Sequence, residues 1–82
     1  MMLKNKNLKE LENKLGINYK VESFSTEAYS YNVKITHKYF RIILMENIKS
    51  RNEINIQFSR TCMLNYKELY NLLDTINNYF NL

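Results

Sequence analysis

The chain has 82 residues, of which 45% are hydrophobic, and these values predict one packed core rather than two domains or a disordered chain. Its single cysteine excludes an internal disulfide and a zinc site built from several thiolates, and it is typical of a reducing compartment. The formal net charge of +4 disfavours an acidic mimic of nucleic acid, so we expect one basic domain over residues 1–82.

A short amphipathic helix is predicted near the start of the chain. Three leucines recur there at helical spacing: Leu8, Leu11 and Leu15. Asn7 stands at the N-cap position, and Glu10 stands at the position of a capping box. The helix should end at Gly16, the only glycine, in a left-handed conformation with an apolar contact from Ile17.

Four strands of alternating polarity are predicted next, joined by a turn at 25–27, a turn near His37 and Lys38, and a loop over 47–52. The third strand is apolar on both faces, but the other strands alternate, so the four should pair antiparallel with one face open to water or to a partner. The core-facing residues are Ile17, Tyr19 and Val21, then Tyr29, Tyr31, Val33 and Ile35, then Phe40, Ile42 and Leu44, and finally Ile54, Ile56 and Phe58.

The last segment carries a strong helix signal. Asn65 is placed as the N-cap, Glu68 follows at the capping-box position, and Leu64 with Leu69 forms a hydrophobic staple. A wide apolar stripe follows at helical spacing: Leu69, Leu72, Leu73, Ile76, Tyr79 and Phe80. The sequence therefore predicts an α+β fold in the order helix, four antiparallel strands, helix, with both helices on one face of the sheet.

Residue types that usually carry catalysis are few and scattered in this sequence. His37 has no Asp, Glu or Cys at motif spacing and is interpreted as a solvated turn residue. Cys62 is interpreted as a small buried hydrophobic residue. Tyr66 and Tyr70, one helical turn apart, are interpreted as the edge of the core rather than as a contact strip. We therefore expect no catalytic residue, no metal and no cofactor.

The open face of the sheet and its adjoining loop form the candidate binding site. Strand alternation and the loop together place cations among aromatic and apolar residues: Lys20, Phe24, Lys34, Tyr39, Arg41, Ile43, Met45, Lys49 and Arg51. Aromatic, Met and Arg side chains are enriched in protein interfaces, which favours a protein partner. Alternatively, the cations and rings hold single-stranded nucleic acid, or, in a weaker interpretation, a signalling nucleotide.

In size and composition the chain resembles the small accessory proteins of bacteriophages and mobile elements in low-G+C bacteria, including anti-CRISPR proteins. That resemblance implies a non-enzymatic inhibitor that blocks a CRISPR effector or another defence enzyme by covering a functional surface. The longest apolar run, Ile42 to Met45, is too short to span a membrane, so we expect the host cytoplasm as its location. Homodimer formation would hide an apolar face or a strand edge.

Overall fold

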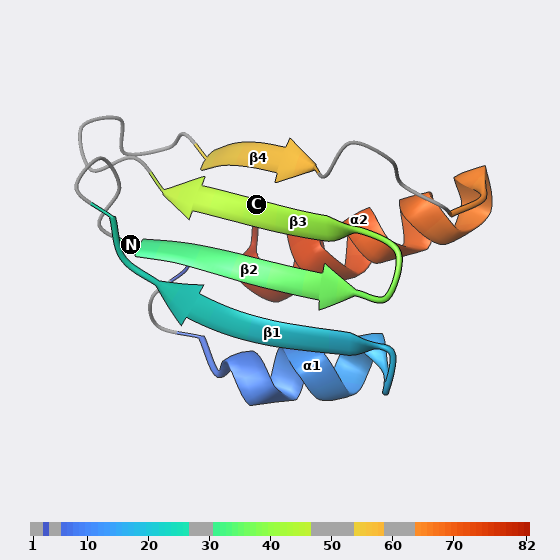
Figure 1. The fold of residues 1–82 in the computed structure, drawn as a ribbon, viewed down its shortest axis with the longest axis horizontal. Coiled ribbons are helices and arrows are strands. Elements are labelled where there is room, and N and C mark those ends of the chain that lie inside the picture. Colours follow the sequence, from blue (N-terminus) through green and yellow to red (C-terminus); the bar gives the residue numbers. More distant parts are fainter. Residues whose placement is uncertain (1–2, 4–5, 27–30, 47–53, 59–63) are drawn as a thin grey trace.

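The computed structural model describes residues 3, 6–26, 31–46, 54–58 and 64–82, and its elements follow the predicted order (Figure 1). Four strands form one antiparallel sheet in which each strand pairs with its neighbour in the chain. Both helices lie on the same face of the sheet, so the α+β prediction is confirmed. The elements are α1 (Leu8–Leu15), β1 (Tyr19–Phe24), β2 (Tyr31–His37), β3 (Arg41–Glu46), β4 (Ile54–Phe58) and α2 (Tyr66–Phe80).

Both helices begin at the predicted asparagines. The side chain of Asn7 accepts hydrogen bonds from the backbone N–H groups of Lys9 and Glu10, at 3.0 and 3.4 Å. Asn65 accepts one from the backbone N–H of Glu68 at 2.8 Å. These bonds satisfy donors that the first helical turn leaves without an intrahelical partner.

The junction between α1 and β1 differs from the prediction. Gly16 has the expected positive φ, +107°, but its ψ of 176° lies outside the left-handed helical region. Its carbonyl accepts the backbone N–H of Tyr19 at 3.2 Å, so Ile17 occupies a turn instead of beginning the strand. The side chain of Ile17 is fully exposed, and its predicted roles in the helix end and in the core are therefore wrong.

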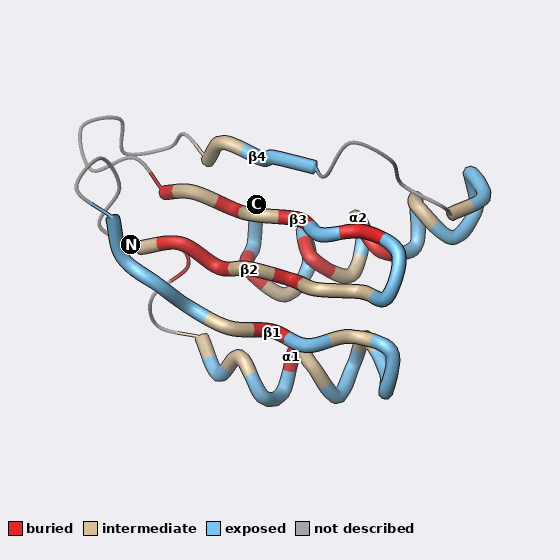
Figure 2. Tube along the Cα trace, viewed as in Figure 1, coloured by how far each residue is buried: buried red, intermediate tan, exposed pale blue. Residues whose placement is uncertain are grey.

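The core lies between the two helices and the middle of the sheet (Figure 2). The register places Val21, Ile35 and Ile42 opposite one another on the helix side. Only part of the predicted apolar stripe of α2 is fully buried in the core, since Leu69 and Leu73 are half-buried. The buried hydrophobic residues are Leu3, Leu11, Val21, Val33, Ile35, Phe40, Ile42, Leu44, Leu72, Ile76 and Phe80.

β4 departs from the predicted burial. Ile56 and Phe58 share the helix side of the sheet with the core residues that they pair with, Leu44 and Ile42. They nevertheless remain 45% and 41% exposed, because the helices do not cover this edge strand as they cover the middle of the sheet. Their predicted place in the core is therefore wrong, although the predicted strand and its alternation are right.

A buried carboxylate holds the start of the described chain against the sheet. Glu46, at the end of β3, is 5% exposed and accepts the backbone N–H of Leu3 at 2.9 Å. Leu3 itself is fully buried. The contact joins residues 43 positions apart, so no local sequence pattern indicates it.

Several predictions fall on residues outside the described ranges. They concern the inward-facing Tyr29, the turn residue Glu27, the loop over 47–52 and the buried position of Cys62.

Candidate functional site

We call the side of the sheet opposite the two helices the outer face. The strand register arranges it in three rows that cross the strands. The rows consist of Lys20, Thr36 and Arg41, then Glu22, Lys34, Ile43 and Gln57, then Phe24, Asn32, Met45 and Asn55. Six of the predicted binding residues therefore share this face: Lys20, Phe24, Lys34, Arg41, Ile43 and Met45.

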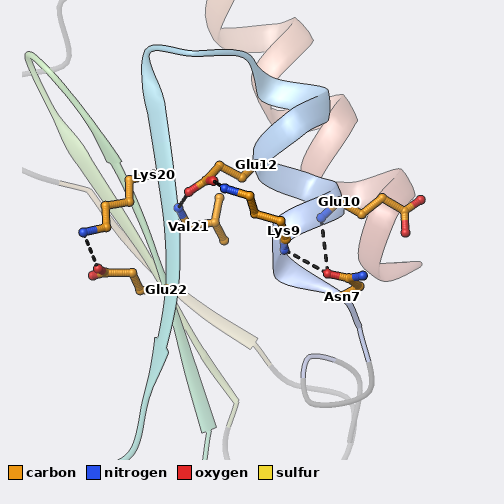
Figure 3. A network of polar contacts seen from close by, with 7 residues as sticks. All are labelled: Asn7, Lys9, Glu10, Glu12, Lys20, Val21 and Glu22. Carbon is orange, nitrogen blue, oxygen red and sulfur yellow. Dashed lines mark hydrogen bonds and ion pairs between the residues drawn. The ribbon is translucent and has the colours of Figure 1, made fainter.

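Glu22 lies between two of the predicted cations. One of its carboxylate oxygens is 2.9 Å from Nζ of Lys20, and the other is 3.5 Å from Nζ of Lys34. Figure 3 shows the Lys20–Glu22 pair on the side of β1 that faces away from α1. The hydrogen bond from Lys20 lowers the pKa of Glu22, and Glu22 in turn raises the pKa of Lys20. Two of the lysines of the outer face thus share one carboxylate, an arrangement that the strand pattern alone did not reveal.

The apolar part of the outer face is less exposed than predicted. Ile43 and Met45 are half-buried, whereas Phe24 is 38% exposed. Asn32, which the alternation assigns to the wet face, is fully buried between Phe24 and Met45 in its row. Its Nδ2 donates to the carbonyl of Phe24 at 3.1 Å, while its Oδ1 has no hydrogen-bond partner. No local sequence signal distinguishes this asparagine from its exposed counterparts.

The other three predicted binding residues do not belong to the outer face as described. Tyr39 lies in the turn between β2 and β3, 57% exposed, and the prediction that it sits on a strand is wrong. The turn is closed by a bond from the N–H of His37 to the carbonyl of Phe40, which leaves Tyr39 outside the strand pairing. Lys49 and Arg51 lie outside the described residues.

His37 is part of an aromatic cluster rather than a solvated turn residue, which corrects the prediction. Its ring stacks on Phe40 with centroids 4.6 Å apart and tilts against Tyr19 at 4.8 Å. Its Nδ1 accepts the backbone N–H of Tyr39 at 3.2 Å. An open groove beside it is lined by Lys14, Leu15, Asn18, Tyr19, His37, Leu64, Glu68, Asn71, Leu72 and Thr75. The ring contacts and the hydrogen bond of His37 indicate that it packs the end of the sheet.

A second open groove is lined by residues of α1, of the segment before it and of α2. There the hydroxyl of Tyr79 in α2 donates to the backbone carbonyl of Asn7 and lies 3.5 Å from Oε2 of Glu10. Burial, followed by the nearby charge of Glu10, raises the pKa of Tyr79. Lys6 lies over the Tyr79 ring, 5.9 Å from its centroid. The groove thus brings together residues that dock α1 on α2.

Tyr66 and Tyr70 are surface residues at the start of α2, not the edge of the core. Their side chains are 73% and 53% exposed, and their hydroxyl oxygens are 3.0 Å apart. The rings meet edge to face with centroids 4.7 Å apart. The hydrogen bond with Tyr70 raises the pKa of Tyr66. The interpretation that placed them at the core is therefore wrong.

Among the residues that the structure describes, no three His, Cys, Asp or Glu side chains gather into a group that could hold a metal ion. In the same part of the chain, neither helix is long and apolar enough to cross a membrane.

Comparison with known proteins assigns no family: no protein-family model, no curated protein and no solved structure matches this chain.

Proposed function

We propose that this chain is a non-enzymatic protein-binding module that uses its outer face. The observation that carries this proposal is the position of Glu22 between Lys20 and Lys34. A surface that binds nucleic acid gains affinity by replacing counterions of the phosphates with its own cations. A carboxylate among those cations repels phosphate and weakens that gain. The charge arrangement of the outer face therefore favours a protein over a nucleic acid.

The uncharged part of the outer face also suits a protein partner. Phe24, Ile43 and Met45 belong to residue types that form the cores of protein interfaces, and Arg41 is a common interface anchor. The polar neighbours Asn55 and Gln57 are neutral amides, which are typical of an interface rim. A partner that covers the face would remove the exposed Phe24 ring from water.

The biological role that agrees best with this surface is that of a stoichiometric inhibitor. The resemblance in size and composition to anti-CRISPR and other anti-defence proteins of bacteriophages supports it. In this role the module would act in the cytoplasm of a bacterial host and cover a functional surface of a CRISPR effector or another defence enzyme.

Affinity capture from bacterial host extract tests the proposal. The tagged chain is incubated with nuclease-treated extract at moderate salt, and bound proteins are identified by mass spectrometry. We expect one protein in stoichiometric amount, and we expect Phe24→Asp to weaken its binding about tenfold or more, as for an aromatic anchor of an interface. Ile17→Asp introduces the same charge at a fully exposed position away from the outer face and should bind like the unmodified chain.

The nucleic-acid alternative has a distinct result in the same system. If material is captured only from extract that has not been treated with nuclease, binding to labelled single-stranded DNA is measured at several salt concentrations. A steep fall in affinity with salt, together with its loss in the Lys34→Glu and Arg41→Glu double variant, would overturn the protein-binding proposal.

A further inference from the structure

The two edges of the sheet are protected to different degrees. At β1, Oε1 of Glu12 in α1 accepts the backbone N–H of Val21 at 3.0 Å, and α1 lies alongside the strand (Figure 3). β1 also carries the charged residues Lys20 and Glu22. Helical cover and charged side chains are the usual means by which proteins keep an edge strand from pairing with another chain. The β1 edge is therefore blocked.

The β4 edge has neither form of protection in the described part of the chain. β4 pairs there only with β3, on one side. Its sequence, Ile54–Phe58, contains no charged residue and no proline. On the helix side, Ile56 and Phe58 extend two rows of core residues outward and stay 45% and 41% exposed. An uncharged edge with an exposed apolar flank is a template for a further strand.

We propose that β4 is the seam of a homodimer, in which β4 of a second copy pairs with it antiparallel around Ile56. A two-fold axis at Ile56 places Ile54 opposite Phe58 on the helix side and Asn55 opposite Gln57 on the outer face. Every contact then joins apolar to apolar or amide to amide. The two four-stranded sheets merge into one.

A second copy fits this edge because the edge is uncharged and its pattern is symmetric. Each copy carries a net charge of +4, which opposes association of two copies, so a seam without cations avoids adding to that repulsion. β4 meets that condition, and its five-residue pattern is complementary to itself. It offers no charged side chain that would select a different protein. Five residue pairs form a contact below the roughly 1,200 Å² of a standard interface, so we expect a weak, concentration-dependent dimer.

Sedimentation velocity over a range from about 1 to about 500 μM tests the dimer. We expect a monomer at the low end and a dimer at the high end. Ile56→Lys would place two ammonium groups directly opposite each other at the axis, so this variant should remain monomeric. Ile17→Lys adds the same charge at a fully exposed turn position and should dimerise like the unmodified chain. A chain that is monomeric throughout the range would overturn the proposal.

A pair of double variants tests the register. Asn55→Lys with Gln57→Glu creates two attractive pairs across the axis, whereas Asn55→Glu with Gln57→Glu creates two repulsive ones. We expect the first to tighten the dimer and the second to abolish it. Circular dichroism of each variant verifies folding. If the two double variants dimerise equally, or if Ile56→Lys still dimerises, β4 is not the seam. Phe24→Asp, on the outer face, should not affect the dimer, so this test is independent of partner binding.

Discussion

Glu12 uses its two carboxylate oxygens for two different elements. Oε2 binds Nζ of Lys9 within α1 at 2.7 Å, and Oε1 accepts the backbone N–H of Val21 in β1 at 3.0 Å. The hydrogen bond from Lys9, and after it the one from Val21, lowers the pKa of Glu12 below 4.5. One side chain therefore links the first helix to the first strand and blocks the edge of the sheet.

We expect Glu12→Gln to lower the thermal midpoint near neutral pH, because the amide keeps an acceptor for Val21 but loses the charge that binds Lys9. Since the folded-state pKa of Glu12 is the lower one, its stabilisation is present above the unfolded-state value. It is lost as the pH falls through the folded-state value. Thermal melts from neutral to acidic pH should therefore show the two proteins converging as Glu12 becomes protonated in the folded state.

The control for this measurement is Asp74→Asn, which removes an exposed carboxylate from α2. It should leave the thermal midpoint near neutral pH unchanged, as expected of a surface substitution. If Glu12→Gln lowers the thermal midpoint by the same amount at neutral and acidic pH, the charge of the Glu12 carboxylate does not stabilise the fold.

The connection between α1 and β1 shows how tightly two elements can be joined. Only Gly16, Ile17 and Asn18 separate the end of the helix from Tyr19, the first residue of the strand. Gly16 makes this reversal with φ of +107° and ψ of 176°, in a region that residues with a Cβ rarely adopt. The space around its Cα is open, since a Cβ there would meet no atom within 4 Å.

We expect Gly16→Ala to lower the free energy of unfolding by about 1–3 kcal/mol, through backbone strain and not through a clash. Urea denaturation followed by circular dichroism measures the change. Asn13→Ala, at an exposed position inside α1, is the matched control and should be neutral or slightly stabilising because alanine favours helix. If Gly16→Ala leaves the free energy of unfolding unchanged, the junction has relaxed to another backbone geometry.

At the scale of the whole molecule, contacts between distant parts of the chain complete the core. Leu3 is bound to Glu46 across 43 positions, and Tyr79 is bound to Asn7 across 72. The first of these contacts places an N-terminal leucine in the same buried cluster as the strands and α2. Leu3 and the last turn of α2 are therefore parts of the core.

We expect Leu3→Ala to cost about 2–5 kcal/mol of unfolding free energy, as for other fully buried leucines. Leu82→Ala makes the same change at the other end of the chain, where the leucine is 44% exposed, and should stay within about 0.5 kcal/mol. Urea denaturation of both variants provides the comparison. Equal effects of the two substitutions would contradict the assigned position of Leu3 in the core.

Local patterns were sufficient to predict the elements and the face on which most residues lie. The N-caps Asn7 and Asn65 were predicted correctly because capping depends on residues within one helical turn. The alternation in β2 and β3 assigned Lys34, Ile43 and Met45 to the outer face correctly, because strand geometry repeats every two residues. The order of the helices and strands, the fold class and the candidate binding face of the sheet thus follow from interactions between near neighbours in the chain.

The tertiary structure alone decided which side chains are buried and which charged side chains form ion pairs. Ile56 and Asn32 obey the same alternation as their neighbours, yet the first is exposed on the helix side and the second is buried on the outer face. Likewise, Glu22 acquires Lys34 as a partner only because β1 and β2 pair in this register. Periodicity specifies the direction of a side chain relative to its own backbone. What lies in that direction depends on where distant elements pack. The sequence by itself therefore determined which face of the sheet each side chain occupies, while the tertiary structure decided whether that side chain is buried or exposed.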